Sequence, residues 1–317
     1  MITATNIRKS FNGVTAVEGI SFQVRPGDVV GFLGPNGAGK STTMKMLTGF
    51  LTPDSGEIRI NDLPIENAKK AIQQQMGYLP EGAPSYADMT PIQMLDFIAE
   101  VRGLSSGFKR KRINEVIDLV SLDTVLDKPI EQLSKGFKRR VGLAQAILHD
   151  PTILILDEPT DGLDPNQKYQ VRELISQLSK DKMVIISTHI LEEVSAVCNR
   201  AMVLAKGQIL FDSTPQALQA KSAFHQAVSI HFDTLPPREL FLGLDALSDL
   251  VIDESQRVVT LFPKRDTQVR GEALLKSATR CLQDNAIQAR AIYVEQGRLD
   301  EVFRQMTQET TVQRANG

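Results

Sequence analysis

A glycine-rich segment between an apolar run and a predicted helix constrains this chain more than any other feature. Residues 34–42 read Gly-Pro-Asn-Gly-Ala-Gly-Lys-Ser-Thr, which fits the spacing G-x-x-x-x-G-K-[ST], and they directly follow the apolar run 29–33. A loop wrapped round a polyphosphate turns successive backbone N–H groups inward, and glycine permits that curvature because it has no Cβ. The strand-loop-helix order predicts an α/β fold in which this loop binds the phosphates of a nucleoside triphosphate.

The residues that follow the glycines supply the charge and the metal ligand of such a site. The segment from Lys40 to about Thr48 is predicted to be a helix, whose N-terminus favours anions. We expect the Lys40 ammonium to contact the β- and γ-phosphates and the Ser41 hydroxyl to ligate Mg²⁺. The predicted nucleotide contacts of the loop are Gly34, Pro35, Asn36, Gly37, Ala38, Gly39, Lys40, Ser41 and Thr42.

Two later apolar strands end in polar residues. The run 152–156 is followed by Asp157 and Glu158, and the run 183–186 leads through Ser187 and Thr188 into His189. Parallel strands bind ligands at their carboxyl ends, where Asp157 can reach the Mg²⁺ shell while Glu158 faces an attacking water. A solvated turn is the alternative for an Asp-Glu pair before proline, but its combination with Lys40 and Ser41 favours the functional interpretation.

The order of these motifs resembles that of the nucleotide-binding subunits of ABC (ATP-binding cassette) proteins. The segment 133–137, Leu-Ser-Lys-Gly-Phe, is similar to the family's signature sequence, and 158–165, Glu-Pro-Thr-Asp-Gly-Leu-Asp-Pro, looks like its D-loop. The marks occur in order across residues 1 to about 215, and the end of the chain looks like that of export-type subunits of the drug-efflux and gliding-motility groups. The resemblance implies a P-loop NTPase (RecA-like) core with an antiparallel β subdomain and an inserted helical subdomain.

The resemblance also implies roles for residues within one copy of the chain. Phe11 should stack on adenine, where an aromatic ring offers contact area at low entropic cost. Glu158 would be the catalytic carboxylate, Asp157 the magnesium aspartate and His189 the γ-phosphate sensor, with Lys40 also in the catalytic set. The implied activity is ATP hydrolysis with Mg²⁺.

Partners follow from the same resemblance. Ser134 and Gly136 would touch the γ-phosphate held by a second copy, so two copies sandwich the nucleotides and a monomer should hydrolyse poorly. Integral membrane permease subunits would receive the movement, which makes the chain the energy-supplying subunit of an exporter. We expect a cytoplasmic protein, peripheral on the inner face of the cell membrane.

Three positions depart from the family pattern. Glu81 stands where the family usually has a Gln that links the site to its partner; near Mg²⁺ a carboxylate binds the metal more strongly but repels the phosphates. Glu81 is therefore a third candidate metal ligand, beside Ser41 and Asp157. In the signature, Lys135 replaces the usual Gly and Phe137 the usual Gln, so those two contacts do not carry over.

Length and periodicity predict two domains in the 317 residues. The nucleotide-binding domain is expected at 1–222, with the helical subdomain at about 85–150, where apolar residues recur at helical spacing after Thr90-Pro91. Alternating strands and amphipathic helices predict a small α+β domain at 223–310, followed by a polar tail at 311–317. The loop 81–89 is a candidate for binding a helix of a partner protein, and a purely structural turn is the alternative.

Composition limits the other functions. The net charge of −2 gives no support to nucleic-acid binding, and the basic runs 109–112 and 138–140 are interpreted as solvated helix faces, with contact to anionic lipid headgroups as the alternative. Two distant cysteines offer neither a disulfide framework nor a zinc site. No window of eighteen uninterrupted apolar residues predicts a membrane span, and residues 1–6 lack signal-peptide character.

Two rival functions remain. A soluble ABC ATPase acting on ribosomes or DNA typically carries two cassettes or a long coiled coil, and this chain has one phosphate loop and no sustained heptad. A P-loop kinase would leave the segment at 133–137 unexplained.

Overall fold

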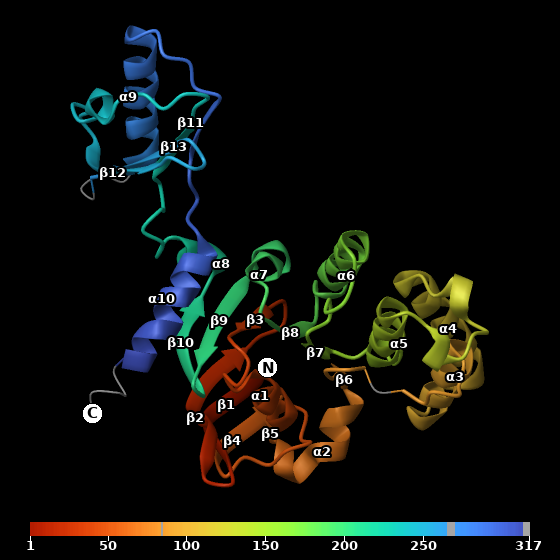
Figure 1. The fold of residues 1–317 in the computed structure, drawn as a ribbon. Helices are drawn as coiled ribbons and strands as arrows, with labels where there is room; N and C mark the ends of the chain where they lie inside the picture. Colours follow the sequence, from red (N-terminus) through yellow and green to blue (C-terminus); the bar gives the residue numbers. More distant parts are fainter. Residues whose placement is uncertain (84, 265–269, 313–317) are drawn as a thin grey trace. The chain divides into compact units, whose positions relative to one another are not determined.

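The strands of the described residues, 1–83, 85–264 and 270–312 of the computed structural model, form three β-sheets (Figure 1). The chain divides into a first unit, Met1–Pro215, which contains two of these sheets, and a second unit, Gln216–Gly317, which contains the third. Each unit has its own cluster of buried apolar residues. The α/β architecture expected from the sequence is present.

The central sheet of the first unit has the strand order β10-β9-β3-β8-β7-β6. Five of these strands run parallel, while β10 pairs with β9 as an antiparallel hairpin. The bounds are β3 (Val29–Leu33), β6 (Met76–Leu79), β7 (Ile153–Asp157), β8 (Met183–Thr188), β9 (Arg200–Ala205) and β10 (Gln208–Ser213). Because β8 lies between β3 and β7, the loops that follow these three strands meet at one edge of the sheet.

An antiparallel sheet of order β2-β1-β4-β5 lies beside the central sheet and shares its core. Its strands are β1 (Ile2–Phe11), β2 (Val14–Val24), β4 (Ser55–Ile60) and β5 (Leu63–Pro64). Phe22 of β2 packs edge-to-face against Phe32 of β3, with ring centroids 5.4 Å apart. The expected antiparallel β subdomain is therefore present.

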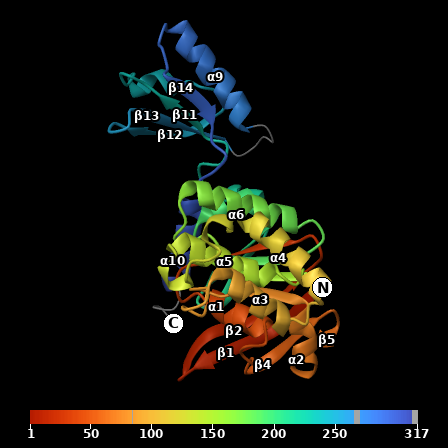
Figure 2. The same cartoon turned by 90° about the vertical axis from the view of Figure 1, so that its right-hand side faces the viewer.

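Helices α3, α4 and α5 lie together on one side of the first unit (Figure 2). Their bounds are α3 (Pro91–Val101), α4 (Ser106–Val120) and α5 (Lys135–Ile147), with short 3-10 turns η1 (Asp123–Val125) and η2 (Ile130–Gln132) between α4 and α5. The predicted start of α3 is confirmed, because Thr90 and Gln93 bond to each other's backbone N–H in a capping box. This is the inserted helical part of the unit.

The other helices of the first unit are α1 (Lys40–Leu47), α2 (Ile65–Gln74), α6 (Pro165–Leu178) and α7 (Leu191–Val197). Asp164 caps α6 through a capping box with Gln167, as the Asp-Pro pair predicts. Helix α7, which the sequence pattern does not indicate, packs against β3 and β8. α7 begins two residues after His189, so its packing helps to position the loop that carries this histidine.

The second unit is an antiparallel sheet of order β12-β13-β11-β14 with α9 packed on it. Its elements are β11 (Val228–His231), β12 (Leu247–Asp253), β13 (Val258–Pro263), β14 (Ala291–Val294), α9 (Arg270–Asp284), α10 (Leu299–Val312), the 3-10 turn η3 (Arg238–Phe241) and α8 (Pro215–Gln219), which begins at the boundary. Leu274, Ala278 and Leu282 of α9 are buried in its core.

Two expectations fall partly on residues that are not described. The predicted polar tail begins at 311, but α10 continues to Val312 and 313–317 lie outside the described residues, as does Pro84 in the loop 81–89. Across the described ranges, the helices lack the combination of length and apolar character that crossing a bilayer needs.

Candidate active site

The glycine-rich loop 34–42 joins β3 to α1, as its spacing predicts. Gly39, directly before α1, has φ +103°, and a Cβ added there would lie 2.6 Å from the carbonyl oxygen of Ala16. A Cβ on Gly34 would lie 2.4 Å from the carbonyl oxygen of Leu204. Both positions therefore require glycine, the first for its left-handed backbone and the second for its close backbone neighbour.

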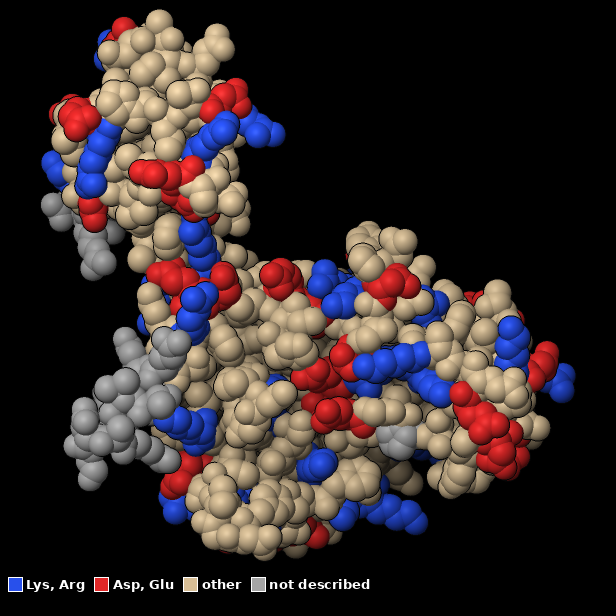
Figure 3. All heavy atoms as spheres, viewed as in Figure 1, with Lys and Arg blue, Asp and Glu red and all other residues tan. Residues whose placement is uncertain are grey.

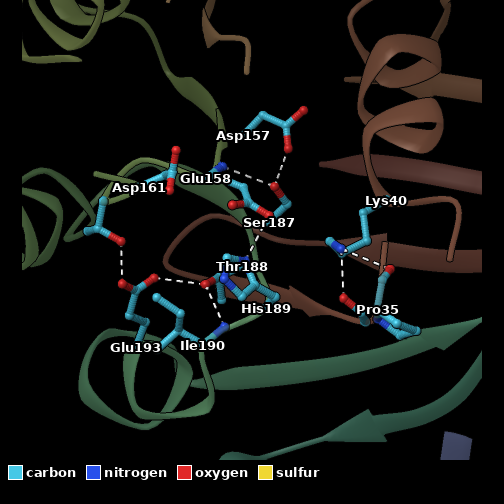
Figure 4. A network of polar contacts seen from close by, with 12 residues as sticks. Pro35, Lys40, Asp157, Glu158, Asp161, Ser187, Thr188, His189, Ile190 and Glu193 are labelled. Carbon is cyan, nitrogen blue, oxygen red and sulfur yellow. Dashed lines mark hydrogen bonds and ion pairs between the residues drawn. The ribbon is translucent and has the colours of Figure 1, made fainter. Parts of the chain in front are cut away.

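Lys40 is folded back over this loop. Its Nζ donates to the carbonyl oxygens of Gly34 (2.7 Å) and Pro35 (3.2 Å), and the residue is buried (Figure 4). Burial lowers the pKa of Lys40, while the nearby carboxylates of Glu158, Asp157 and Glu81 act in the opposite direction. The Lys40 ammonium group therefore interacts electrostatically with the three acidic residues predicted for the site.

Asp157 is the last residue of β7 and is 1% exposed. Its Oδ1 accepts a hydrogen bond from Ser187 Oγ on the neighbouring strand β8, and its Oδ2 has no hydrogen-bond partner among the described residues. A buried carboxylate oxygen without a partner is costly, and a cation removes that cost. This side chain fits a magnesium ligand on the chemistry of its free oxygen.

Acidic residues elsewhere do not form a ready metal cage. In the described part of the chain there is no cluster of three or more His, Cys, Asp or Glu side chains able to hold a metal ion. Mg²⁺ needs no such cluster where one or two protein oxygens act together with water and substrate phosphates. The partner-free oxygen of Asp157 is one protein oxygen of that kind.

Glu158 follows Asp157 in the left-handed region, with φ +50°. Its backbone N–H donates to the carbonyl and hydroxyl oxygens of Ser187, each at 3.1 Å, which fixes this unusual turn. Its carboxylate Oε1 lies 3.1 Å from Nδ1 of His189, within hydrogen-bonding distance (Figure 4). The two side chains of the pair at 157–158 therefore point to different partners.

A buried arginine connects this edge to the helical part. Arg139 of α5 is 6% exposed and donates to the carbonyl oxygens of Pro80 (3.1 Å), Asp157 and Glu158. Burial lowers the pKa of Arg139, and four surrounding carboxylates, those of Asp157, Asp161, Glu158 and Glu81, oppose the shift. Figure 3 shows acidic atoms gathered directly beside basic ones in the middle of this face of the first unit.

The interpretation of the basic runs as solvated faces is wrong for several members. Arg140 is 8% exposed and donates to Gln170 Oε1 (2.6 Å), and Arg112 of α4 donates to the carbonyl oxygens of Ile147 and Leu148. These guanidinium groups are held because α4, α5 and α6 pack together and leave carbonyl groups that need donors. Arg110 and Lys111 remain on the exposed face of α4.

The signature segment begins α5. Ser134 is the N-cap, and its Oγ accepts a hydrogen bond from Phe137 N at 3.3 Å. A Cβ on Gly136 would lie 2.5 Å from Gln167 Oε1, so a larger residue would have to displace that side chain. Lys135 pairs with Asp161 at 2.8 Å, which ties the signature to the loop after β7 within one chain. Asp161 has a lowered pKa, chiefly through this hydrogen bond.

Phe11 and Glu81 lie on the exposed surface. Phe11, at the end of β1, is 46% exposed, and Lys9 Nζ lies 5.8 Å from its ring centroid. Glu81 follows β6 and acts on Lys40 and Arg139 through its charge. Within the described chain, neither Phe11 nor Ser134 makes a hydrogen bond or ion pair with the predicted residues at the sheet edge.

The sequence pattern indicates no role for Ser187 and Arg139, nor for Thr160 and Glu193, whose side chains hydrogen-bond to each other. Ser187 and Thr188 were visible as hydroxyl residues directly before His189, and Glu193 stands four residues after that histidine. Arg139 carried no signal, because it looked like one member of a basic run.

Known proteins resemble this chain along most of its length. The family described as ABC transporter matches residues 17–161. The linearmycin resistance ATP-binding protein LnrL of Bacillus subtilis (strain 168) is 31% identical over 315 residues, covering 98% of this chain and 99% of the relative. The Nod factor export ATP-binding protein I of Paraburkholderia xenovorans (strain LB400) is 37% identical over 68% of this chain and 71% of its own length.

Solved structures share the P-loop fold expected from the sequence over about two thirds of this chain. An ATP-binding subunit of an ABC transporter is 28% identical, covers 70% of this chain and 92% of its own, and has a TM-score of 0.65. The dimeric ATP-binding cassette MJ0796 in a post-hydrolysis state with ADP and Pi superposes with a TM-score of 0.64 over 68% of this chain and 99% of its own, at 22% identity.

Proposed function

This chain belongs to the ATP-binding proteins of ABC transporters, and we propose that its hydrolysis of ATP drives export through separate integral membrane subunits. The observation that carries the proposal is the meeting of Lys40, Asp157, Glu158 and His189 at one edge of the central sheet, with Glu158 and His189 in contact. The export direction rests on the names of the relatives, which describe Nod factor export and linearmycin resistance for those proteins.

Within one copy, the loop 34–42 would hold the ATP phosphates and Phe11 the adenine. The Lys40 ammonium would exchange its two carbonyl partners for β- and γ-phosphate oxygens, which replaces neutral acceptors by charged ones. Ser41 and Asp157 would hold Mg²⁺, with Glu81 as the third candidate; the bound ion neutralises phosphate charge.

Glu158 would polarise the attacking water, and His189 would hold the γ-phosphate while orienting the Glu158 carboxylate. Their contact supports this division, because a base must be fixed within hydrogen-bond reach of the proton that it takes. Phosphoryl transfer asks a protein mainly for positioning and charge neutralisation, which this edge provides.

A second copy would complete each site. We infer that Ser134 and Gly136 of one copy contact the γ-phosphate held by the other, since both stand at the N-terminus of α5, where the helix favours an anion. The Lys135–Asp161 pair would hold that end of α5 at a fixed place relative to the loop after β7.

A groove in the first unit supports the proposal of a membrane partner. Its volume is about 970 Å³, and its lining includes the exposed apolar residues Phe50 and Val101, which are 68% and 66% exposed, together with Ile98. Large apolar side chains left exposed together mark a binding surface. Lys45, Lys69 and Lys70 also line the groove, so we propose that it takes an apolar helix of the membrane subunit carrying an acidic residue.

The groove leads to the catalytic edge through Arg139. Pro80 lines the groove, and its carbonyl oxygen accepts from the guanidinium group that also bonds to the carbonyl oxygens of Asp157 and Glu158. A movement of the partner helix would therefore be transmitted to Asp157 and Glu158 through the Arg139 side chain. The chain would work at the inner face of the cell membrane.

The catalytic half of the proposal is tested by Glu158→Gln. Removing the carboxylate takes away the group that polarises water but leaves the phosphate loop intact, so phosphate release should fall at least ~10²-fold while ATP binding is retained. Steady-state phosphate release and equilibrium dialysis measure the two properties. Glu173→Gln, an exposed glutamate of α6, is the matched control and should hydrolyse like the parent. Full turnover in Glu158→Gln would contradict the assignment.

The partner half is tested by purifying the tagged chain from detergent-solubilised membranes of its own host. The parent should bring a polytopic membrane protein in near-equal amount, whereas Val101→Asp should lose it, because a charge in the groove repels an apolar helix. Leu63→Asp, an exposed apolar residue of β5 that does not line the groove, should keep the partner. Recovery of ribosomes or nucleic acid in place of a membrane protein would overturn the transporter proposal.

A further inference from the structure

Glu193 of α7 is a buried carboxylate to which the proposal above gives no part. It is 5% exposed, its Oε2 accepts a hydrogen bond from Thr188 Oγ1 at 2.8 Å, and its Oε1 accepts one from Thr160 Oγ1. Figure 4 shows Glu193 beside Thr188 and Ile190 at the loop of His189. Both hydroxyl residues are themselves buried.

Burial and its polar neighbours restrict the Glu193 carboxylate to one position. An ionised carboxylate inside a protein is costly unless charged or hydrogen-bonding groups surround it. Here each oxygen accepts from one hydroxyl, and Lys168 Nζ and Arg172 Nη2 both lie 3.9 Å from Oε1. With two donors and two cations converging on it, the side chain has one favourable position.

The two hydroxyls belong to the two loops that carry the hydrolytic residues. Thr160 lies in the turn closed by the hydrogen bond from Asp161 N to Glu158 O at 3.1 Å. Thr188 directly precedes His189, and its Oγ1 also accepts from Ile190 N at 3.0 Å, which holds the turn round the histidine. Glu193 therefore links the turn of Glu158 to the turn of His189 through one hydrogen bond to each.

The contact between Glu158 and His189, which these turns bring together, is poorly shielded from water. The His189 side chain is 52% exposed and that of Glu158 19%, so water competes for their hydrogen bond. A buried carboxylate whose two oxygens each accept a hydrogen bond from one of the two turns is the stronger constraint on their separation.

We propose that Glu193 is a positioning residue that sets the distance between Glu158 and His189 through Thr160 and Thr188. This inference rests on the roles proposed above for Glu158 and His189. It assigns Glu193 no contact with ATP, so its removal should change the rate of the chemical step and leave nucleotide binding alone.

The test is the steady-state kinetics of the full chain with Mg·ATP, comparing Glu193→Gln with Glu192→Gln. Gln has nearly the same volume, but its NH2 group cannot accept a hydrogen bond, so one of the two hydroxyls loses its acceptor, and its neutral head group loses the attraction of Lys168 and Arg172. We expect kcat to fall by about tenfold or more with KM within about twofold, because misplacing catalytic groups by a fraction of an ångström slows the reaction without weakening binding. Glu192 stands next to it on α7 but is exposed, so Glu192→Gln should match the parent.

A second pair of variants separates positioning from folding. Thr188→Val removes the hydroxyl at nearly constant shape and should lower kcat as Glu193→Gln does, while Thr188→Ser should restore it. The double variant Glu193→Gln/Thr188→Val should be little slower than either single variant, because both break the same link.

The outcomes are distinct. If the parent and Glu192→Gln hydrolyse ATP and Glu193→Gln hydrolyses it equally fast, or raises KM at unchanged kcat, the positioning role is refuted while the ATPase stands. If the parent and Glu192→Gln fail to hydrolyse ATP, the proposed function itself fails. Should Glu193→Gln not fold, the Thr188 pair decides: equal kcat in Thr188→Val and Thr188→Ser refutes the inference.

Discussion

At the residue scale, the His149 imidazole is held neutral by its surroundings. Burial is the main cause that lowers the pKa of His149 to about 4, with the charge of Arg102 acting in the same direction. Its Nε2 lies 3.1 Å from the carbonyl oxygen of Met76, while Nδ1 is buried without a partner among the described residues. Protonation would place an unpaired N–H at that nitrogen.

His149 should therefore make the first unit less stable in mild acid. Its folded pKa lies below the ordinary value of 6.5, so between about 6.5 and 4 the unfolded chain binds more protons and stability rises with pH. The contribution is complete above about pH 6.5 and is lost as the pH falls toward 4, by at most about 1.4 kcal/mol per pH unit and by less where water screens the group. Urea unfolding of the first unit at pH 7 and pH 5 measures the loss.

The control for this prediction is a side chain that does not titrate. His149→Gln keeps an amide donor for Met76, and its midpoint in urea should change less between pH 7 and pH 5 than that of the parent. His231→Gln, in the second unit, should leave the pH dependence of the first unit as it is. An equal loss of stability in the parent and in His149→Gln would show that other groups are responsible.

Single residues differ in how well their role can be predicted from the sequence. Lys40, Asp157 and His189 each follow an apolar run, so parallel pairing brings them to one edge whatever the rest of the chain does. Arg139 and Glu193 look like ordinary surface charges, and only the packing of α5 and α7 decides that they are buried. Charge burial is a tertiary property without a local pattern.

At the element scale, the helices with strong start signals are the ones that the sequence predicts well. Thr90 and Asp164 both cap helices whose first residue is proline, as their sequence predicts, and the structure adds a capping box at each. By contrast, α7 has only seven residues, and a helix of that length is unstable alone and forms through its packing on β3 and β8.

The strand β12 (Leu247–Asp253) is not predicted by the sequence pattern, for a second reason. Its register against β13 shifts between Leu247 and Asp249, so the apolar alternation that marks a half-buried strand is interrupted. Leu250 and Ile252 face the core only after that irregularity. A pattern of period two across the whole segment is therefore absent, although the strand is formed.

At the scale of the whole molecule, the two units have separate apolar cores and the predicted nucleotide site uses residues of the first alone. A ligand that binds only the folded state stabilises the unit that holds it. At a Mg·ATP concentration 100 times the dissociation constant, amide exchange through global unfolding of the first unit should slow about 100-fold.

Hydrogen exchange followed by mass spectrometry checks this expectation. Peptides of β3, β7 and β8 should gain protection with Mg·ATP, and peptides of β11 and β13 should not. Lys40→Ala is the control, because it removes the phosphate contact and should abolish the gain. Equal protection of both units would mean that nucleotide binding reaches the second core.

The strand order of the central sheet has a consequence for synthesis of the chain. Val29 pairs with Val184 and Leu33 with Thr188, so the phosphate loop obtains its sheet neighbour only after most of the first unit has been made. Pairings between such distant segments close late and slowly. A nascent chain interrupted before Met183 would carry the glycine-rich loop and β7 without the strand that separates them. The predicted nucleotide site is therefore among the last parts of the first unit that can form during synthesis.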